Sequence, residues 1–220
     1  MIALRDSLRR IVMDHMAQDP AHDLAHLDRV WRTAEQIALD DDSVALRVLM
    51  AACYLHDLVN LPKDAPNRAQ ASTLAAKQAA PILTDLGFCE PEIASACHAI
   101  AAHSYSAGIP PETPEARILR DADRLDALGA IGIARCFVVS GALNRPLYDP
   151  EDPFATARPL NDGQFALDHW PVKLLRLPDD MMTDTGRKIA LTRRADMLRF
   201  ARSLANDMGT TLPPDWTDPT

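Results

Sequence analysis

The chain has 220 residues, of which 47% are hydrophobic, and its formal net charge is −8 at pH 7. This composition supports a sizeable core, which excludes a disordered chain and favours one domain with an extension. The negative charge argues against a broad phosphate-binding surface, so we expect no nucleic acid polymer as a partner.

The longest apolar run, Val48 to Leu55, is far shorter than the roughly 20 residues that a membrane helix needs. We therefore expect no membrane partner. Four cysteines are present and no two form a C-x-x-C pair, which favours buried free thiols in a reducing compartment. The charges at Arg5 and Asp6 come too early for a signal peptide, so we expect a cytoplasmic protein.

Apolar residues recur at helical spacing through most of the chain, without an alternating strand pattern. Ser43 is the expected N-cap of the third helix, and Gly87 is expected to end the fourth. This pattern predicts an all-α fold. The expected helices cover residues 2–16, 23–39, 44–58, 68–86, 90–103, 115–135 and beyond, 165–175 and 182–208.

The expected organisation is a single helical domain. Residues 1–20 form a helix that packs on a core of residues 21–140, and residues 165–208 add C-terminal helices. Residues 141–164 contain four prolines and no periodicity, so we expect a loop that serves as a lid. Residues 209–220 are expected to be a loose tail. An apolar face on the 182–208 helix could pack on the core or support a homodimer.

Two polar residues, His56 and Asp57, end the most apolar helix of the chain. A buried carboxylate is costly unless it is paired or holds a cation. His26 and Asp123 lie on other expected helices, and helices from distant parts of a chain can bring single ligands together. Two imidazoles and two carboxylates suit Mn²⁺, Fe²⁺, Mg²⁺ or Zn²⁺. Spacing alone leaves ordinary capping or ion-pair roles open.

The order His26, His56-Asp57, Asp123 resembles the signature of the HD-domain metal-dependent phosphohydrolases. The stretch 121–126, Asp-Ala-Asp-Arg-Leu-Asp, resembles a segment of the stringent-response alarmone hydrolases. Three further stretches, 101–104, 129–135 and 148–150, resemble a small bacterial group of HD phosphohydrolases. The resemblance covers most of the chain, from about Leu24 to Leu177.

This resemblance implies an all-helical, HD-type core in which His26, His56, Asp57 and Asp123 bind a divalent metal ion. Mn²⁺ is the expected cofactor, with Mg²⁺, Fe²⁺, Ni²⁺ and Zn²⁺ as alternatives. The implied activity is cleavage of a phosphoester or phosphoanhydride bond by a metal-activated water. The implied substrate is a small phosphorylated molecule, a nucleotide, and the enzyme is a nucleoside triphosphate pyrophosphohydrolase or a nucleotide phosphatase.

The sequence departs from the alarmone hydrolases directly after His56-Asp57. Those enzymes place an acidic pair there, whereas this chain has Asn60-Leu61. An amide can orient water but cannot act as a base, which argues against alarmone hydrolysis. The expected catalytic residues that handle protons are therefore His103 and Asp126, with the metal as the third candidate.

Several residues are candidates for substrate binding. Lys63, Arg68 and Ser72 follow the metal ligands, and a helix N-terminus with an arginine can hold a phosphate. A solvated helix start explains the same residues equally well. The full expected set is Asn60, Lys63, Arg68, Ser72, Arg145 and Lys173.

Two other functions are compatible with this signature. A non-catalytic HD module could sense a nucleotide or a metal, although the complete ligand set favours catalysis. A two-metal oxygenase needs further histidines on one face, and His98 and His103 are five positions apart, which places them poorly for a shared ion.

Overall fold

The computed structural model describes residues 1–15, 23–59, 61 and 67–216, and every regular element in these ranges is helical. The all-α prediction is confirmed. The chain forms two compact units, Met1–Asp123 and Arg124–Thr220.

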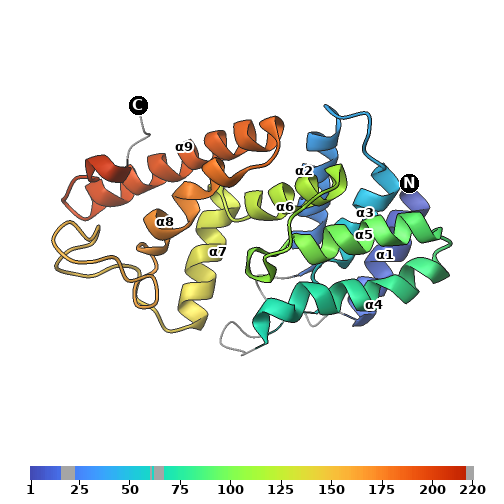
Figure 1. The fold of residues 1–220 in the computed structure, drawn as a ribbon. Coiled ribbons are helices and arrows are strands. Elements are labelled where there is room, and N and C mark those ends of the chain that lie inside the picture. Colours follow the sequence, from blue (N-terminus) through green and yellow to red (C-terminus); the bar gives the residue numbers. More distant parts are fainter. Residues whose placement is uncertain (16–22, 60, 62–66, 217–220) are drawn as a thin grey trace. The chain divides into compact units, whose positions relative to one another are not determined.

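The first unit is built around one apolar helix (Figure 1). This helix, α3 (Leu46–Leu55), contacts α1, α2, α4 and α5, and its residues from Val48 to Leu55 are all buried. A helix that is apolar on all sides is buried on all sides. The apolar run that precedes His56 and Asp57 therefore also forms the core of the first unit. The other elements are α1 (Ile2–His15), α2 (Leu24–Ala38), η1 (Arg68–Gln70), α4 (Ala71–Asp85), α5 (Glu90–Ala102), η2 (Tyr105–Ala107) and α6 (Pro114–Leu125), whose last two residues belong to the second unit.

The start of α3 differs from the prediction. Ser43 is not its N-cap, because its hydroxyl donates to the Asp41 carboxylate and the helix begins at Leu46. The N-cap position is Ala45, which has no capping side chain, and Glu115 Oε1 accepts the Ala45 N–H at 2.8 Å. This contact comes from the first turn of α6, 70 positions away, and local sequence does not reveal it.

Gly87 ends α4 as expected. It adopts a left-handed φ of 73°, which costs glycine little, and its N–H donates to the Thr84 carbonyl at 3.0 Å. The Phe88 N–H donates to the Leu83 carbonyl at 3.0 Å, which completes a common helix-ending motif. The start of the predicted 68–86 helix is a 3-10 turn, and the α-helix proper begins at Ala71.

The continuous helix expected from Glu115 through Arg135 is wrong. In the structure α6 ends at Leu125 and α7 (Gly129–Ala142) begins after a short turn. Gly129 has a φ of 69°, and a Cβ on Gly132 would lie 2.2 Å from the Ala127 carbonyl oxygen. Glycine at these two positions permits the turn, while the apolar periodicity continues across it and hides the break.

The second unit also contains α8 (His169–Val172), η3 (Leu174–Asp180), α9 (Asp184–Asp207) and η4 (Pro214–Trp216). The helix expected over 165–175 is therefore wrong in extent, since only α8 is α-helical there. Residues 143–168 form no regular element, which agrees with the expected loop.

The 143–168 loop is tied to the body of its unit. Arg158 forms two hydrogen bonds with the fully buried Asp168, at 2.6 and 2.9 Å, and Phe154 is buried. Trp216 is 3% exposed and its ring centroid lies 5.2 Å from that of Phe154. Within the expected loose tail, Trp216 is therefore packed. The domain boundaries and the role of the loop as a lid stay predictions.

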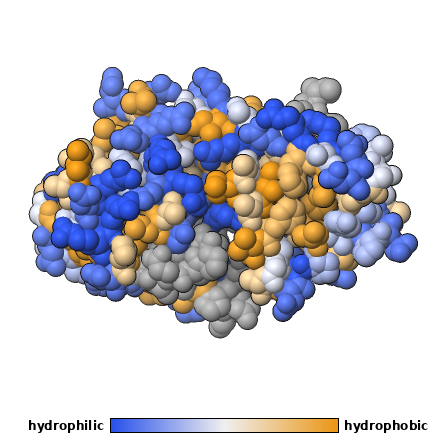
Figure 2. All heavy atoms as spheres, turned by 180° about the vertical axis from the view of Figure 1, so that it is seen from behind, coloured by the Kyte–Doolittle hydropathy of each residue, from blue (hydrophilic) through white to orange (hydrophobic). Residues whose placement is uncertain are grey.

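Polar side chains cover much of the surface seen in Figure 2, and apolar side chains form separate patches between them. Among the described helices, none by itself has the length and hydrophobicity of a membrane span, although α6 and α7 taken together pass that test by length and composition. The four cysteines are free, and Cys89 is exposed, so not every thiol is buried.

Candidate metal centre

His26 lies in the first turn of α2 and is 1% exposed. Asp23 is the N-cap of this helix, and its carboxylate accepts the His26 N–H at 2.7 Å. This cap satisfies one N–H of the first turn, where no partner exists within the helix. The local sequence therefore fixes the point at which the helix starts and the face on which His26 lies.

His56 follows directly after α3 and is also 1% exposed. Its Nδ1 lies 2.9 Å from the Cys53 carbonyl oxygen, which can only accept, so Nδ1 carries the proton and donates. In the neutral ring, this leaves the lone pair of Nε2 available. The buried Nε2 has no hydrogen-bond partner among the residues that the structure describes. A metal ligand held by a carbonyl behind its ring has this arrangement.

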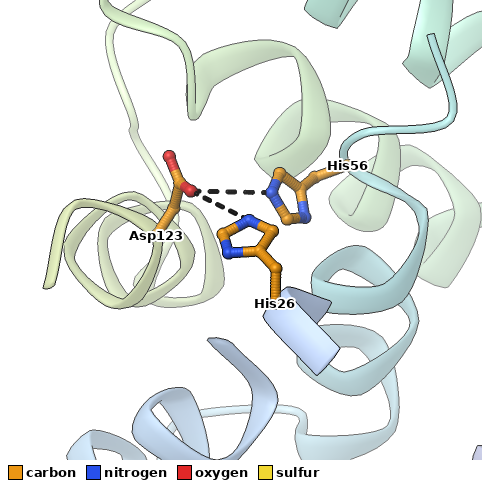
Figure 3. Close-up of side chains that lie close together, drawn as sticks. All are labelled: His26, His56 and Asp123. Carbon is orange, nitrogen blue, oxygen red and sulfur yellow. Dashed lines mark ion pairs between the residues drawn. The ribbon is translucent and has the colours of Figure 1, made fainter. Parts of the chain in front are cut away.

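Two carboxylates face these histidines. Asp123 Oδ1, from α6, lies 3.5 Å from His26 Nε2 and 3.7 Å from His56 Nε2 (Figure 3). Asp57 Oδ2 lies 3.6 and 3.5 Å from the same two nitrogens. The ligand atoms of His26, His56 and Asp123 all lie within 4.8 Å of one another, so this group is able to hold a metal ion.

The two carboxylates stabilise positive charge within the site. Burial disfavours the charged form of His56, but Asp57 and Asp123 outweigh it and raise its pKa to about 9. Burial likewise opposes the charge of Asp123, yet the neighbouring His26 and His56 rings hold its pKa well below the ordinary value. A site that stabilises positive charge in this way also favours an added cation.

His103 lies beside the cluster at the C-terminal end of α5 and is 8% exposed. Its Nδ1 donates to the Ile100 carbonyl at 2.6 Å, and its Nε2 lies 3.9 Å from Asp57 Oδ1. The centroids of the His103 and His56 rings are 4.8 Å apart. Burial, followed by the neighbouring His56, lowers the pKa of His103, which favours the neutral ring.

The other expected site residues have varied surroundings. Asp126 is buried in the second unit and accepts a hydrogen bond from Arg135 at 2.6 Å. The Ser72 hydroxyl donates to the Ala101 carbonyl at 2.9 Å, and the Arg68 guanidinium donates to the Leu61 carbonyl. Their functional roles stay predictions, as do those of the remaining candidates. Arg145 and Lys173 lie in the second unit, and Asn60 and Lys63 fall outside the described residues.

A polar network close to the ligands is not apparent from the sequence. The Tyr54 hydroxyl donates to Asp28 Oδ1 at 2.7 Å, and Arg5 Nε donates to the Tyr54 oxygen at 2.8 Å. Arg9 pairs with the same carboxylate. The network joins α1, α2 and α3 two residues away from His26 and His56, so it fixes the helices that carry both ligands. In the sequence, this network is indicated only by the positions of Asp28 and Tyr54, which lie two residues from His26 and His56 respectively.

Comparison with known proteins agrees with this geometry. Residues 23–128 match the family model of the HD domain. The chain is 32% identical over 195 residues to the uncharacterized protein YpgQ of Bacillus subtilis (strain 168), covering 87% of this chain and 86% of that protein. The chain belongs to the HD-domain family.

Solved structures share its fold. A crystal structure of Bacillus subtilis YpgQ in complex with ADP superimposes with a TM-score of 0.71 at 29% identity and covers 98% of both chains. An HD-superfamily hydrolase from Bacillus thuringiensis also gives a TM-score of 0.71, at 28% identity, and covers 94% of this chain and 96% of its own. The fold of the chain is thus that of the HD-superfamily hydrolases.

Proposed function

We propose that this protein is a metal-dependent phosphohydrolase that cleaves a phosphoester or phosphoanhydride bond of a nucleotide. The observation that carries the proposal is the convergence of two buried imidazole nitrogens and two partly exposed carboxylates from α2, α6 and the end of α3. The nucleotide is supported by the relative that was crystallised with ADP. Within this class we favour a nucleoside triphosphate pyrophosphohydrolase or a nucleotide phosphatase.

The residues fit a divalent ion. His26, His56, Asp57 and Asp123 would hold it, because the buried His56 Nε2 faces the cluster, carries a lone pair once the ring is neutral, and lies beside two carboxylates that offer oxygens. When bound, such an ion, Mn²⁺ in our proposal, acts as a Lewis acid on a phosphate oxygen and makes water a stronger acid.

The chain itself supplies proton handling at the edge of this cluster. The neutral His103 ring donates through Nδ1 to Ile100, so its Nε2 is able to accept a proton. That nitrogen lies 3.9 Å from Asp57 Oδ1, next to the ligands. Asp126, which lies in the second unit and forms an ion pair with Arg135, stays the second candidate.

The proposal is tested by ³¹P NMR of metal-stripped protein mixed with Mn²⁺ and a panel of nucleoside mono-, di- and triphosphates. Pyrophosphate released from a triphosphate establishes a pyrophosphohydrolase, and orthophosphate establishes a phosphatase. If metal and nucleotide bind but no nucleotide is turned over, the proposal fails and a sensing module replaces it.

Asp57→Ala removes one carboxylate from the cluster. We expect activity to fall to background and the metal content after desalting to decrease, because the cation loses an oxygen ligand and a compensating charge. Metal analysis and circular dichroism measure content and fold, and Asp85→Ala, at the exposed end of α4, is the matched control. Full activity in Asp57→Ala would contradict the ligand assignment.

A further inference from the structure

The polar network of Arg5, Asp28 and Tyr54 joins α1, α2 and α3 and takes no part in the proposed chemistry. The Tyr54 hydroxyl on α3 donates to Asp28 Oδ1 on α2 at 2.7 Å. Arg5 on α1 bonds to both partners: its Nε donates to the Tyr54 oxygen at 2.8 Å, and its Nη2 donates to Asp28 Oδ1 at 3.1 Å. The three side chains therefore form a closed cycle in which each contacts the other two.

The second carboxylate oxygen of Asp28 extends this cycle. Asp28 Oδ2 pairs with Arg9, which lies four positions after Arg5 on the same face of α1. Hydrogen bonds between guanidinium groups and a carboxylate are directional and stronger than those between neutral groups. The network thus restrains the rotation of α2 and α3 and their sliding along one another, as well as their separation.

The network lies at the level of two expected metal ligands. Asp28 follows His26 by two positions on α2, and Tyr54 precedes His56 by two positions at the end of α3. His56 keeps helical dihedral angles, with φ −65° and ψ −30°. Two positions correspond to a rotation of about 200° and a rise of about 3 Å. The network and the two imidazoles therefore lie close together along the helices but on different faces of them.

Apolar packing also holds α2 against α3, and each helix carries a fully buried leucine, Leu27 and Leu55. Such packing is not directional, whereas a designed site needs its ligands within about 0.5 Å of the productive geometry. The rings of His26 and His56 are carried by these two helices, and their centroids lie 5.6 Å apart (Figure 3). A shift of α3 along α2 therefore changes the separation of the two ligand nitrogens directly.

We propose that Arg5, Asp28 and Tyr54 are positioning residues of the metal centre. They fix α2 against α3 and thereby hold His26 Nε2 and His56 Nε2 at the separation that one divalent ion requires. The inference rests on the proposed function, because it takes the ion of that function as given. The competing explanation is that the network anchors α1 and contributes only to stability.

The test is titration of metal-stripped protein with Mn²⁺ and with Co²⁺, whose visible absorption depends on the number and arrangement of its ligands. Tyr54→Phe removes the hydroxyl and retains the ring. It should weaken Mn²⁺ binding about tenfold, the lower end of the loss that follows removal of groups supporting metal ligands. It should also alter the Co²⁺ spectrum, which a loss of stability alone leaves unchanged.

A second variant keeps the test decisive if Tyr54→Phe does not fold. The Arg5 side chain is 39% exposed, so Arg5→Gln leaves no cavity in the core. It removes the guanidinium that bonds to both Tyr54 and Asp28. We expect the same weakening of Mn²⁺ binding and the same direction of change in the Co²⁺ spectrum.

Two matched controls break polar contacts on the same helices. Arg47→Gln loses the ion pair with Glu92 on α5, and Arg47 lies nine positions before His56, about 13.5 Å along α3. Arg10→Gln lies on α1 and loses a bond to the Asp6 carbonyl of its own helix. Both controls should keep the Mn²⁺ affinity and the Co²⁺ spectrum of the wild type.

Urea denaturation of the metal-free proteins measures stability separately. The proposal is overturned if Tyr54→Phe and Arg5→Gln lose stability but keep the wild-type affinity and spectrum. It is also overturned if Arg47→Gln weakens Mn²⁺ binding as much as they do.

These outcomes separate the positioning role from the proposed function, since metal titration needs no turnover. If no nucleotide is hydrolysed, the function fails, while a selective loss of Mn²⁺ affinity in the two network variants still supports the positioning role. If the wild type hydrolyses a nucleotide and both variants bind metal as it does, the positioning role fails and the function stands.

Discussion

His56 and His103 each donate through Nδ1 to a carbonyl three residues earlier in the chain, at Cys53 and Ile100 respectively. The resemblance to the HD-domain family indicated His26, His56, Asp57 and Asp123, whereas their spacing alone left capping and ion-pair roles open. The carbonyl partners could not be read from the sequence, since they depend on where each helix ends. Sequence likewise indicated His103 but did not show that its Nε2 faces Asp57.

At this residue scale, His103→Gln tests proton handling. Glutamine keeps a polar side chain but cannot accept a proton near neutral pH, so kcat should fall about 10²-fold with an unchanged metal content. Steady-state kinetics and metal analysis provide the two measurements. His98→Gln is the control on the same helix, since His98 only accepts the Glu112 N–H in this structure. Equal losses in both variants would remove the special role of His103.

At the scale of helices, the sequence indicated most elements but misplaced several boundaries, of which two are instructive. Ser43 lies where a local cap would be expected, yet α3 begins after Ala45, whose N–H donates to Glu115 of a distant helix. The break before Gly129 was missed because apolar residues continue in phase on both sides of it. In both places a tertiary contact or a backbone conformation determines where the helix begins or ends. The amphipathic pattern of the sequence contains no information about either.

Gly132→Ala tests the glycine requirement at the start of α7. The new Cβ would lie 2.2 Å from the Ala127 carbonyl oxygen, so the turn must shift, and we expect a loss of about 1–3 kcal/mol in the free energy of unfolding. Gly141→Ala, in the same helix with nothing within 4 Å of its Cβ, should be neutral or stabilising by up to about 1 kcal/mol. Urea denaturation compares the two. A stable Gly132→Ala protein would show that the turn adapts freely.

At the scale of the whole molecule, the chain divides into the units Met1–Asp123 and Arg124–Thr220. The boundary falls within α6, directly after the last expected metal ligand. No proline, glycine or change of composition marks this point in the sequence, so the division could not be foreseen. Each unit has its own centre: α3 in the first, and aromatic residues around the fully buried Trp170 in the second.

Arg158→Ala tests what holds the long loop of the second unit. The change leaves the Asp168 carboxylate buried without its cation, which typically costs about 3–5 kcal/mol. Hydrogen exchange should accelerate throughout residues 143–168, while amides of α3 in the first unit remain protected. Arg187→Ala, on α9, is the surface control. Unchanged exchange in the loop would mean that its other contacts suffice.

The carbonyls that orient His56 and His103 also belong to the last turns of α3 and α5, where main-chain acceptors lack partners within the helix. Each imidazole is thus a C-terminal stop for its helix and a candidate ligand or proton acceptor at once. A carboxylate in place of either histidine could still bind a cation, but it could not donate a hydrogen bond to the carbonyl three residues earlier. Such a substitution would therefore fray the end of the helix. Selection on helix integrity and selection on activity therefore act on the same two side chains.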